Sequence, residues 1–202
     1  MLAEIGLTCL LLAFIAAVYA VIAALYGARK HNDRFVNSAR NAALLTFPLL
    51  LVSALVLLIG LLNHQYQIAY VWQVSNPSTP DFYRFTALWG SQQGSLLFWC
   101  LVMSAFSAAA ITLNWRSNHR LMPYVIAYTM VTLAFFIGLS LFLENPFARY
   151  WILPDNSVVS TVLIPAGGVA PSSLRLAETA RGLNPLLRHF GMIIHPPMLS
   201  LG

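Results

Sequence analysis

His195 is the side chain of this sequence best suited to bind a metal. It stands directly before Pro196 and Pro197 and has apolar residues on both sides. Proline excludes the residue before it from the helical region, so His195 is fixed in an extended kink, and a helix can begin directly after it. A neutral imidazole can bind haem iron or zinc. The residues by themselves favour a histidine at the start of a helix over a metal ligand, and both interpretations stay open.

A second cluster that could do chemistry is the polar segment 89–95, which reads Trp-Gly-Ser-Gln-Gln-Gly-Ser. Polar groups at the boundary of a membrane must find hydrogen-bond partners. In one interpretation the segment is a satisfied turn, with Trp89 and Trp99 in an interfacial aromatic belt. In the other, Trp89 and Gln92 form a rim that docks a flat aromatic ligand, such as haem, or a partner helix. The residues alone favour the turn.

The remaining reactive side chains form no catalytic set. Cys9 and Cys100 are neither a C-x-x-C pair nor part of a C-x-x-C-H haem attachment site, so we expect two small buried apolar residues. The sequence has no acid pair, no nucleophile beside a base and no glycine loop that opens a soluble nucleotide-binding unit. We therefore predict no catalytic residue in this chain.

The other histidines are weaker candidates for metal binding. His189 lies six residues before His195, and on one helix the two side chains would be about 240° apart, so they could not grip the same metal. We expect His189 in a loop, His64 at the end of a span, and His31 and His119 in solvated links.

These side chains must be positioned by helices that cross a membrane. Hydrophobic residues make up 59% of the chain and charged residues only 8%, and the mean hydropathy is +0.73. A soluble domain carries about a quarter charged residues, which excludes that class. Four apolar runs have the ~20 residues that cross ~30 Å of hydrocarbon. They are residues 2–26, 42–62, 95–113 and 121–143. A fifth run begins near residue 190 and is cut off at Gly202.

The charged residues predict the orientation of this single membrane domain, 1–202. Glu4 precedes the first span while Arg29 and Lys30 follow it, which is typical of a retained anchor with its N-terminus outside and not of a cleaved signal peptide. The two short links between spans are basic and therefore face the cytoplasm, so loops 63–94 and 144–189 are external. The net charge of +5 follows from this topology, and we expect no nucleic-acid partner.

The first external loop contains a predicted helix. Thr79 can cap it, Pro80 suits its first position, and Asp81 favours its positive end. Aromatic and apolar residues then recur at helical spacing: Phe82, Phe85, Leu88 and Trp89. We predict a short amphipathic helix that lies at the membrane interface.

Other parts of the external loops are expected to be extended or irregular. Residues 68–74 are rich in aromatic and β-branched side chains and are predicted to be extended. Proline and glycine punctuate the stretch 154–181, in which only residues 158–164 could form a short strand.

Several segments resemble the N-terminal part of the CcmF family, the haem lyase subunits of cytochrome c maturation. They are residues 63–99, the turn 145–147, and residues 182–187 followed by 191–199. The most specific motifs are Ser75-Asn76-Pro77 leading through 89–99, and His195-Pro196-Pro197-Met198-Leu199. The first span and Glu4-Ile5-Gly6 are similar too. The resemblance therefore covers nearly the whole chain, in order.

The resemblance implies a multi-pass protein of the bacterial inner membrane. Such a protein receives haem b, its substrate, from a haem chaperone outside and helps to join it to an apocytochrome c, together with other maturation subunits. The resemblance makes His195 an axial ligand of the haem iron. In this family a second external histidine and a tryptophan-rich segment complete the site, and both lie beyond Gly202. We therefore expect an incomplete haem site and no activity from this chain alone.

Two other functions stay open. A membrane subunit of a respiratory or transport complex would line an ion path with ionisable residues, and the four spans contain none centrally. The stop inside the fifth run would also fit a non-functional, truncated remnant.

Overall fold

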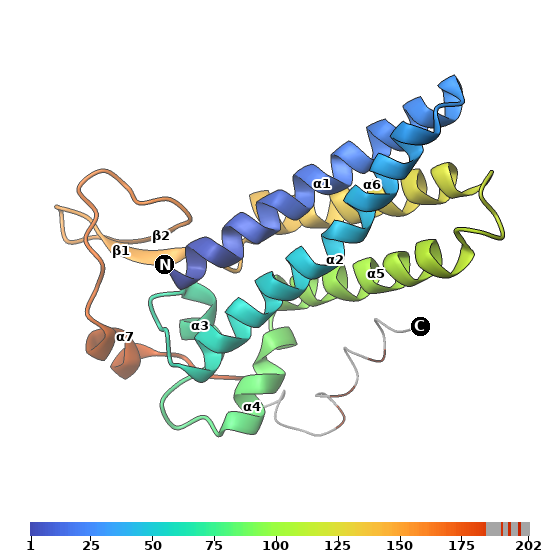
Figure 1. Cartoon of the computed structure of the whole chain (residues 1–202). Coiled ribbons are helices and arrows are strands. Elements are labelled where there is room, and N and C mark those ends of the chain that lie inside the picture. Colours follow the sequence, from blue (N-terminus) through green and yellow to red (C-terminus); the bar gives the residue numbers. More distant parts are fainter. Residues whose placement is uncertain (185–190, 192–193, 195–197, 199–202) are drawn as a thin grey trace.

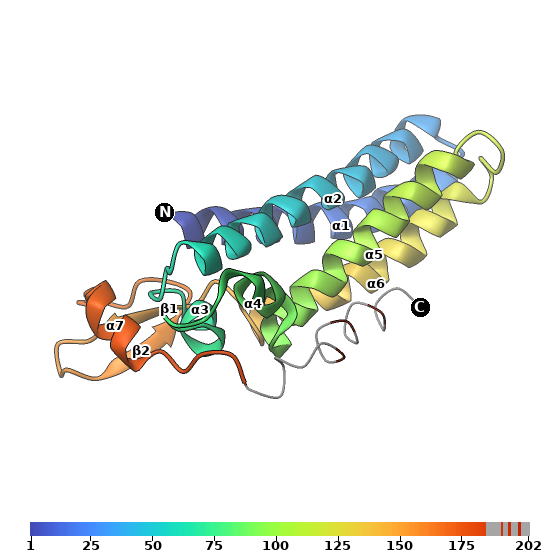
Figure 2. The same ribbon diagram turned by 90° about the horizontal axis from the view of Figure 1, so that it is seen from below.

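Four long helices form the membrane-spanning part of the chain. The computed structural model describes residues 1–184, 191, 194 and 198. The long helices are α1 (Leu2–Lys30), α2 (Asp33–Leu62), α5 (Gln92–Asn114) and α6 (Met122–Phe142), packed lengthwise as an elongated bundle (Figures 1 and 2). Each is long and apolar enough to cross a bilayer. The predicted all-α, polytopic architecture with four spans is confirmed. The fifth run, from residue 190, falls largely outside the described residues.

The first two helices continue beyond their predicted spans, 2–26 and 42–62. Only His31 and Asn32 separate α1 from α2, so most of the short basic link between these spans is helical. His31 adopts a left-handed conformation with φ 50°, which ends α1. The Asn32 side chain then accepts a hydrogen bond from the Arg34 amide at 3.0 Å and caps α2. The basic residues of this region therefore sit on helix ends.

Small side chains allow α1 to pack closely against its neighbours. Its buried face is rich in alanine, and an interface of small residues lets helix backbones approach one another. These buried alanines are Ala13, Ala17, Ala20, Ala23 and Ala24. Farther along the same interface, the Ser53 hydroxyl of α2 donates to the Gly6 carbonyl of α1 at 3.1 Å. The two helices thus share a hydrogen bond in addition to packing.

The segments outside the bundle gather at the end where the chain begins (Figure 1). We call residues 63–91 and 144–184 the cap. It contains α3 (Ala69–Val74), α4 (Asp81–Thr86), the 3-10 helix η1 (Ala87–Trp89), the strands β1 (Arg149–Ile152) and β2 (Val158–Thr161), and α7 (Ser173–Thr179).

Two predictions for the first part of the cap are corrected. Residues 69–74 form α3 instead of an extended segment, because Tyr70, Val71 and Val74 are buried on one helical face. Thr79 does not cap α4: Pro80 occupies the cap position, and the Thr79 hydroxyl donates instead to Asn76 Oδ1 at 2.6 Å. The expected amphipathic helix is present as α4 followed by η1.

The aromatic face expected on that helix is divided. Phe82 and Phe85 are exposed, as a face toward the membrane interface requires, but Leu88 is only 7% exposed. The change from α4 to η1 turns the last residues toward the bundle, so Leu88 joins the core.

The second part of the cap is more ordered than predicted. The strand expected within residues 158–164 is confirmed as β2, and it pairs with β1 in an antiparallel hairpin in which Trp151 faces Val159. Helix α7 lies in the stretch predicted to be irregular, and that prediction is wrong there.

Candidate functional site

Trp89 and Gln92 lie on either side of the joint between η1 and α5. Trp89 ends η1, the expected break falls at Gly90 and Ser91, and Gln92 opens α5. The ring of Trp89 has its centroid 5.6 Å from that of Phe85 and 5.5 Å from that of Phe98. Trp89 therefore belongs to an aromatic cluster that joins the cap to the span.

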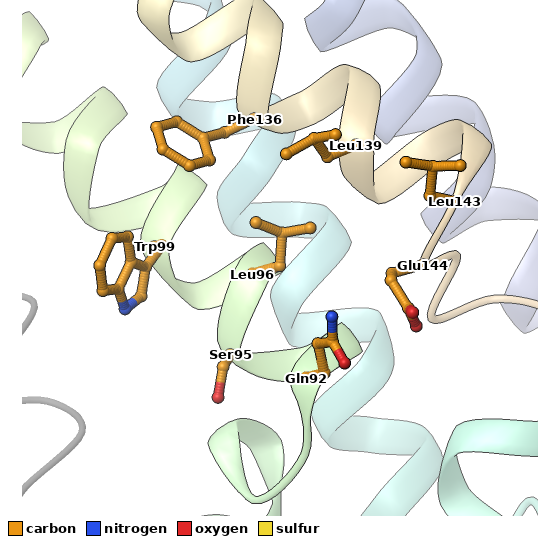
Figure 3. Close-up of a pocket in the computed structure, with 8 residues that line it drawn as sticks. All are labelled: Gln92, Ser95, Leu96, Trp99, Phe136, Leu139, Leu143 and Glu144. Atoms are coloured by element: carbon orange, nitrogen blue, oxygen red, sulfur yellow. The ribbon is translucent and has the colours of Figure 1, made fainter.

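Gln92 lines a cleft of about 370 Å³ between α5 and α6 (Figure 3). The polar residues of this cleft, Gln92, Ser95 and Glu144, gather at one end (Figure 3). The rest of the lining is apolar: Leu96, Trp99, Phe136, Leu139 and Leu143. Trp89 is not part of this lining, so the structure does not bring Trp89 and Gln92 into one rim. Contact of either residue with haem or with a partner stays a prediction.

The predicted metal ligand His195 lies outside the described residues, as does His189. Among the residues that the structure describes, no three histidine, cysteine or acidic side chains converge to hold a metal ion. Cys100 is buried and Cys9 is half-buried, and both are free thiols. The expectation of a small buried residue is thus confirmed for Cys100.

The centre of the cap's polar network is Arg84, a residue of α4 that is only 5% exposed. Its Nη1 donates to Asp81 Oδ1 at 2.8 Å, and its Nη2 donates to the carbonyls of Pro77 at 3.1 Å and Asn76 at 3.4 Å. The planar guanidinium suits such a set of divergent acceptors. Arg84 therefore fixes the turn 76–81 against the start of α4.

Arg84 also reaches the end of α2 through His64. Its Nη1 lies 3.0 Å from His64 Nε2, and His64 Nδ1 lies 3.1 Å from the Tyr66 hydroxyl. Arginine can only donate, so Nε2 accepts and the imidazole carries its proton on Nδ1, donated to Tyr66. Burial raises the pKa of Tyr66 against the opposing charge of Arg84. Both ring nitrogens of His64 are engaged, so this histidine is a structural residue.

Tyr70 locks α3 to the joint between η1 and α5. Its hydroxyl donates to the Ala87 carbonyl at 2.6 Å and to the Leu88 carbonyl at 3.1 Å. Burial of the ring raises the pKa of this hydroxyl. The ring fits because residue 94 is glycine: a Cβ there would fall on the Tyr70 hydroxyl and on the Leu88 carbonyl oxygen.

Trp72 joins the two parts of the cap. Its Nε1 donates to the Thr179 hydroxyl of α7 at 3.2 Å, and its carbonyl accepts from the Arg181 amide at 3.1 Å. Its ring lies edge-on to Tyr150 of β1, with centroids 5.5 Å apart. Segments that are far apart in the sequence therefore form one unit.

Arg84 and Tyr70 organise the cap, and neither was predicted from the sequence. One signal for Arg84 was available, because it is the only basic residue of loop 63–94. A single arginine in a loop whose only acidic residue is Asp81 is expected to pair with that carboxylate and with nearby polar groups. Tyr70 carried no such signal, because its partners lie in a different element.

Comparison with known proteins identifies the architecture. No family model matches the chain. The chain is 31% identical over 205 residues to the cytochrome c-type biogenesis protein CycK of Rhizobium meliloti (strain 1021), covering 100% of the chain and 26% of that relative. It is 32% identical over 202 residues to the cytochrome c-type biogenesis protein CcmF of Escherichia coli (strain K12), covering 100% of the chain and 28% of that relative.

This chain matches an N-terminal part of the CcmF-type proteins. It spans about a quarter of the length of the relatives it matches, 26% of CycK and 28% of CcmF. A solved structure described as a cytochrome c heme lyase CcmF has the same fold over 100% of the chain and 28% of its own length, with a TM-score of 0.72 at 20% identity. The CcmF-type fold thus includes both the bundle and the cap.

Proposed function

We propose that this chain forms the N-terminal helices of a haem-handling membrane protein in cytochrome c-type biogenesis. Its similarity over the full chain to CycK and CcmF, at 31% and 32% identity, carries the proposal. The chain corresponds to 26% and 28% of those proteins. Its role is therefore to position part of a haem site that other segments complete.

The cap faces the outside of the bacterial inner membrane. The two links at the opposite end of the bundle are basic and short, and such links stay in the cytoplasm. The basic residues of these links and of the adjoining helix ends are Arg29, Lys30, Arg34, Arg40, Arg116 and Arg120. The cap has four arginines: Arg84 and Arg149 are buried and paired with Asp81 and Glu4, at 2.8 Å and 3.0 Å. Arg175 and Arg181 are exposed, but they lie far along the chain from the end of α6, and only charges near the ends of a span affect its orientation strongly. They contribute little to the positive-inside signal.

Haem is the substrate of this site, and His195 is the proposed axial ligand of its iron. A neutral imidazole would hold the iron while the edge of the porphyrin stays accessible to the thiols of an apocytochrome c. Trp89 and Gln92, at the junction of cap and bundle, are proposed to contact haem or the partner that delivers it. The partners are a haem chaperone, apocytochrome c and further maturation subunits.

Haem capture tests this proposal. The chain is purified in mild detergent from membranes of its host, together with the subunits that copurify, and the Soret absorbance is measured. We expect a Soret band in the wild type that His195→Ala lowers strongly. His189→Ala is the matched control and should keep the band. Equal bands in the wild type and His195→Ala contradict the ligand assignment, and a wild type without a band contradicts haem handling.

A further inference from the structure

The hairpin of the cap has one open edge. Strand β1 is covered on its far side, because Ile152 exchanges two backbone hydrogen bonds of 2.9 Å with Val169 and the Tyr150 amide donates to the Gln67 carbonyl at 3.0 Å. No described residue forms a backbone pair with the edge of β2 that faces away from β1. A free edge of this kind exposes a row of backbone donors and acceptors.

The register shows which groups of β2 are unpaired. Residues of an antiparallel pair alternate between hydrogen-bonded and non-hydrogen-bonded positions. Tyr150 and Ile152 direct their backbone groups away from β2. The hydrogen-bonded pairs are therefore Trp151 with Val159 and Arg149 with Thr161. The amides and carbonyls of Val158 and Ser160 therefore point to the open edge.

This edge lacks the usual protection against strand pairing. Natural edge strands are blunted by charged residues, proline or bulges. The strand Val158–Thr161 reads Val-Val-Ser-Thr and contains none of these. Val158 is 60% exposed, and the apolar residues just beyond the strand, Leu163 and Ile164, are 76% and 61% exposed.

A cleft of about 430 Å³ lies against the same part of the hairpin. Tyr150, Ile152 and Val158 form its floor, because these alternate residues share one face of the sheet. Trp72 of α3 and Leu176 of α7 supply apolar walls, and Arg175 and Thr179 of α7 add polar groups. Figures 1 and 2 show α7 and the turn of the hairpin at the end of the cap that lies far from the spans, while β1 begins beside the start of α1.

We propose that β2 binds an extended segment of a haem-free cytochrome c polypeptide. The segment adds as a strand to Val158 and Ser160, and every second side chain then points to the cleft face, where an apolar or aromatic side chain fits. The open row of backbone groups selects an extended polypeptide as the occupant, since only a strand satisfies it. The choice of a cytochrome polypeptide rests on the proposed function, in which haem is joined to a chain that lacks it.

Hydrogen exchange resolved to single amides tests the edge directly. The full chain is held in detergent, and the probe is a haem-free c-type cytochrome polypeptide. In the free chain, the Val158 and Ser160 amides exchange fast while the Val159 and Thr161 amides are protected. Addition of the probe slows exchange at Val158 and Ser160. Unchanged exchange at these two amides with saturating probe overturns the proposal.

A pair of variants at one position separates the backbone from the side chain. Ser160→Pro and Ser160→Ala both remove the hydroxyl, but only proline removes the amide that faces the edge, and proline is tolerated on edge strands. We expect Ser160→Pro to bind the probe about tenfold more weakly than Ser160→Ala, from the lost hydrogen bond and the blocked strand. Equal binding by the two variants contradicts strand addition. If proline unfolds the hairpin, Val158→Lys, which adds a second positive charge to the cleft that Arg175 lines, replaces it, and binding as tight as the wild type contradicts the proposal.

The c-type cytochrome content of cells without the chain separates a failure of the edge assignment from a failure of the proposed function. If cells need the chain for c-type cytochromes but Ser160→Pro and Ser160→Ala bind the probe equally, only the edge assignment fails. If cells keep their c-type cytochromes without the chain, the proposed function fails, and the choice of probe fails with it.

Discussion

The Nη1 atom of Arg84 lies 3.0 Å from Nε2 of His64, and this contact ties α4 to the end of α2. The same guanidinium holds Asp81 and two backbone carbonyls, so one buried side chain connects three segments of the cap. Removal of its charge would leave several buried acceptors without a donor, which is costly inside a protein.

Arg84→Met should therefore destabilise the cap. Methionine keeps much of the side-chain length but leaves His64 and two carbonyls unpaired, at a cost of about 2–4 kcal/mol in the free energy of unfolding. Asp81→Asn is the control, because the Asp81 side chain is 82% exposed, and it should cost less than about 1 kcal/mol. Denaturant unfolding of the detergent-solubilised chain measures both. Equal losses for the two variants would contradict the role of Arg84.

Gly94→Ala should also be destabilising. Its added methyl group would collide with the Tyr70 hydroxyl and the Leu88 carbonyl, and overpacking costs about 1–3 kcal/mol. Gly138→Ala is a matched control in α6, where the nearest atom to the new Cβ belongs to Phe14 at an ordinary 3.5 Å. The thermal midpoint in detergent should fall for Gly94→Ala only. A wild-type midpoint for Gly94→Ala would show that α3 does not pack on this joint.

Asp155, in the turn of the hairpin, should titrate below the ordinary range of an aspartate. The Ser157 hydroxyl donates to its carboxylate at 2.7 Å and the Ser157 amide at 3.0 Å, and these bonds lower its pKa. Because the folded pKa is depressed, the stabilisation is present above the unfolded pKa and is lost as pH falls through the folded value. Ser157→Ala should raise the pKa of Asp155, and Ser160→Ala should not. A carboxyl NMR titration decides, and an unchanged pKa in Ser157→Ala would contradict the turn geometry.

The spans were predictable from the sequence because each depends mainly on its own residues. An apolar run of sufficient length indicates a span whatever it packs against. Their ends were less predictable: the turn at His31 and Asn32 depends on one left-handed residue and one cap, so the charges of the link belong to helices.

The cap was less predictable because its contacts are long-range. The composition around Tyr70 favours a strand, and burial against α2 and η1 overrides that preference. Trp72 and Thr179 are 107 residues apart, and no local pattern links them. The cleft at Gln92 likewise needs Glu144, which follows α6. The polar character of segment 89–95 predicted a special position there, but not its partners.

The most direct test of the account is the c-type cytochrome content of cells that lack this chain. Membranes of a deletion strain are separated on denaturing gels and stained for haem, so that only covalently attached haem is detected. The absorbance of b-type cytochromes, which hold haem without a covalent bond, is the control for haem supply.

We expect the deletion strain to lose its c-type bands while its b-type absorbance stays unchanged. The wild-type chain should restore the bands, and His195→Ala should restore few or none. A deletion strain with normal c-type bands would contradict the proposed role in cytochrome c biogenesis.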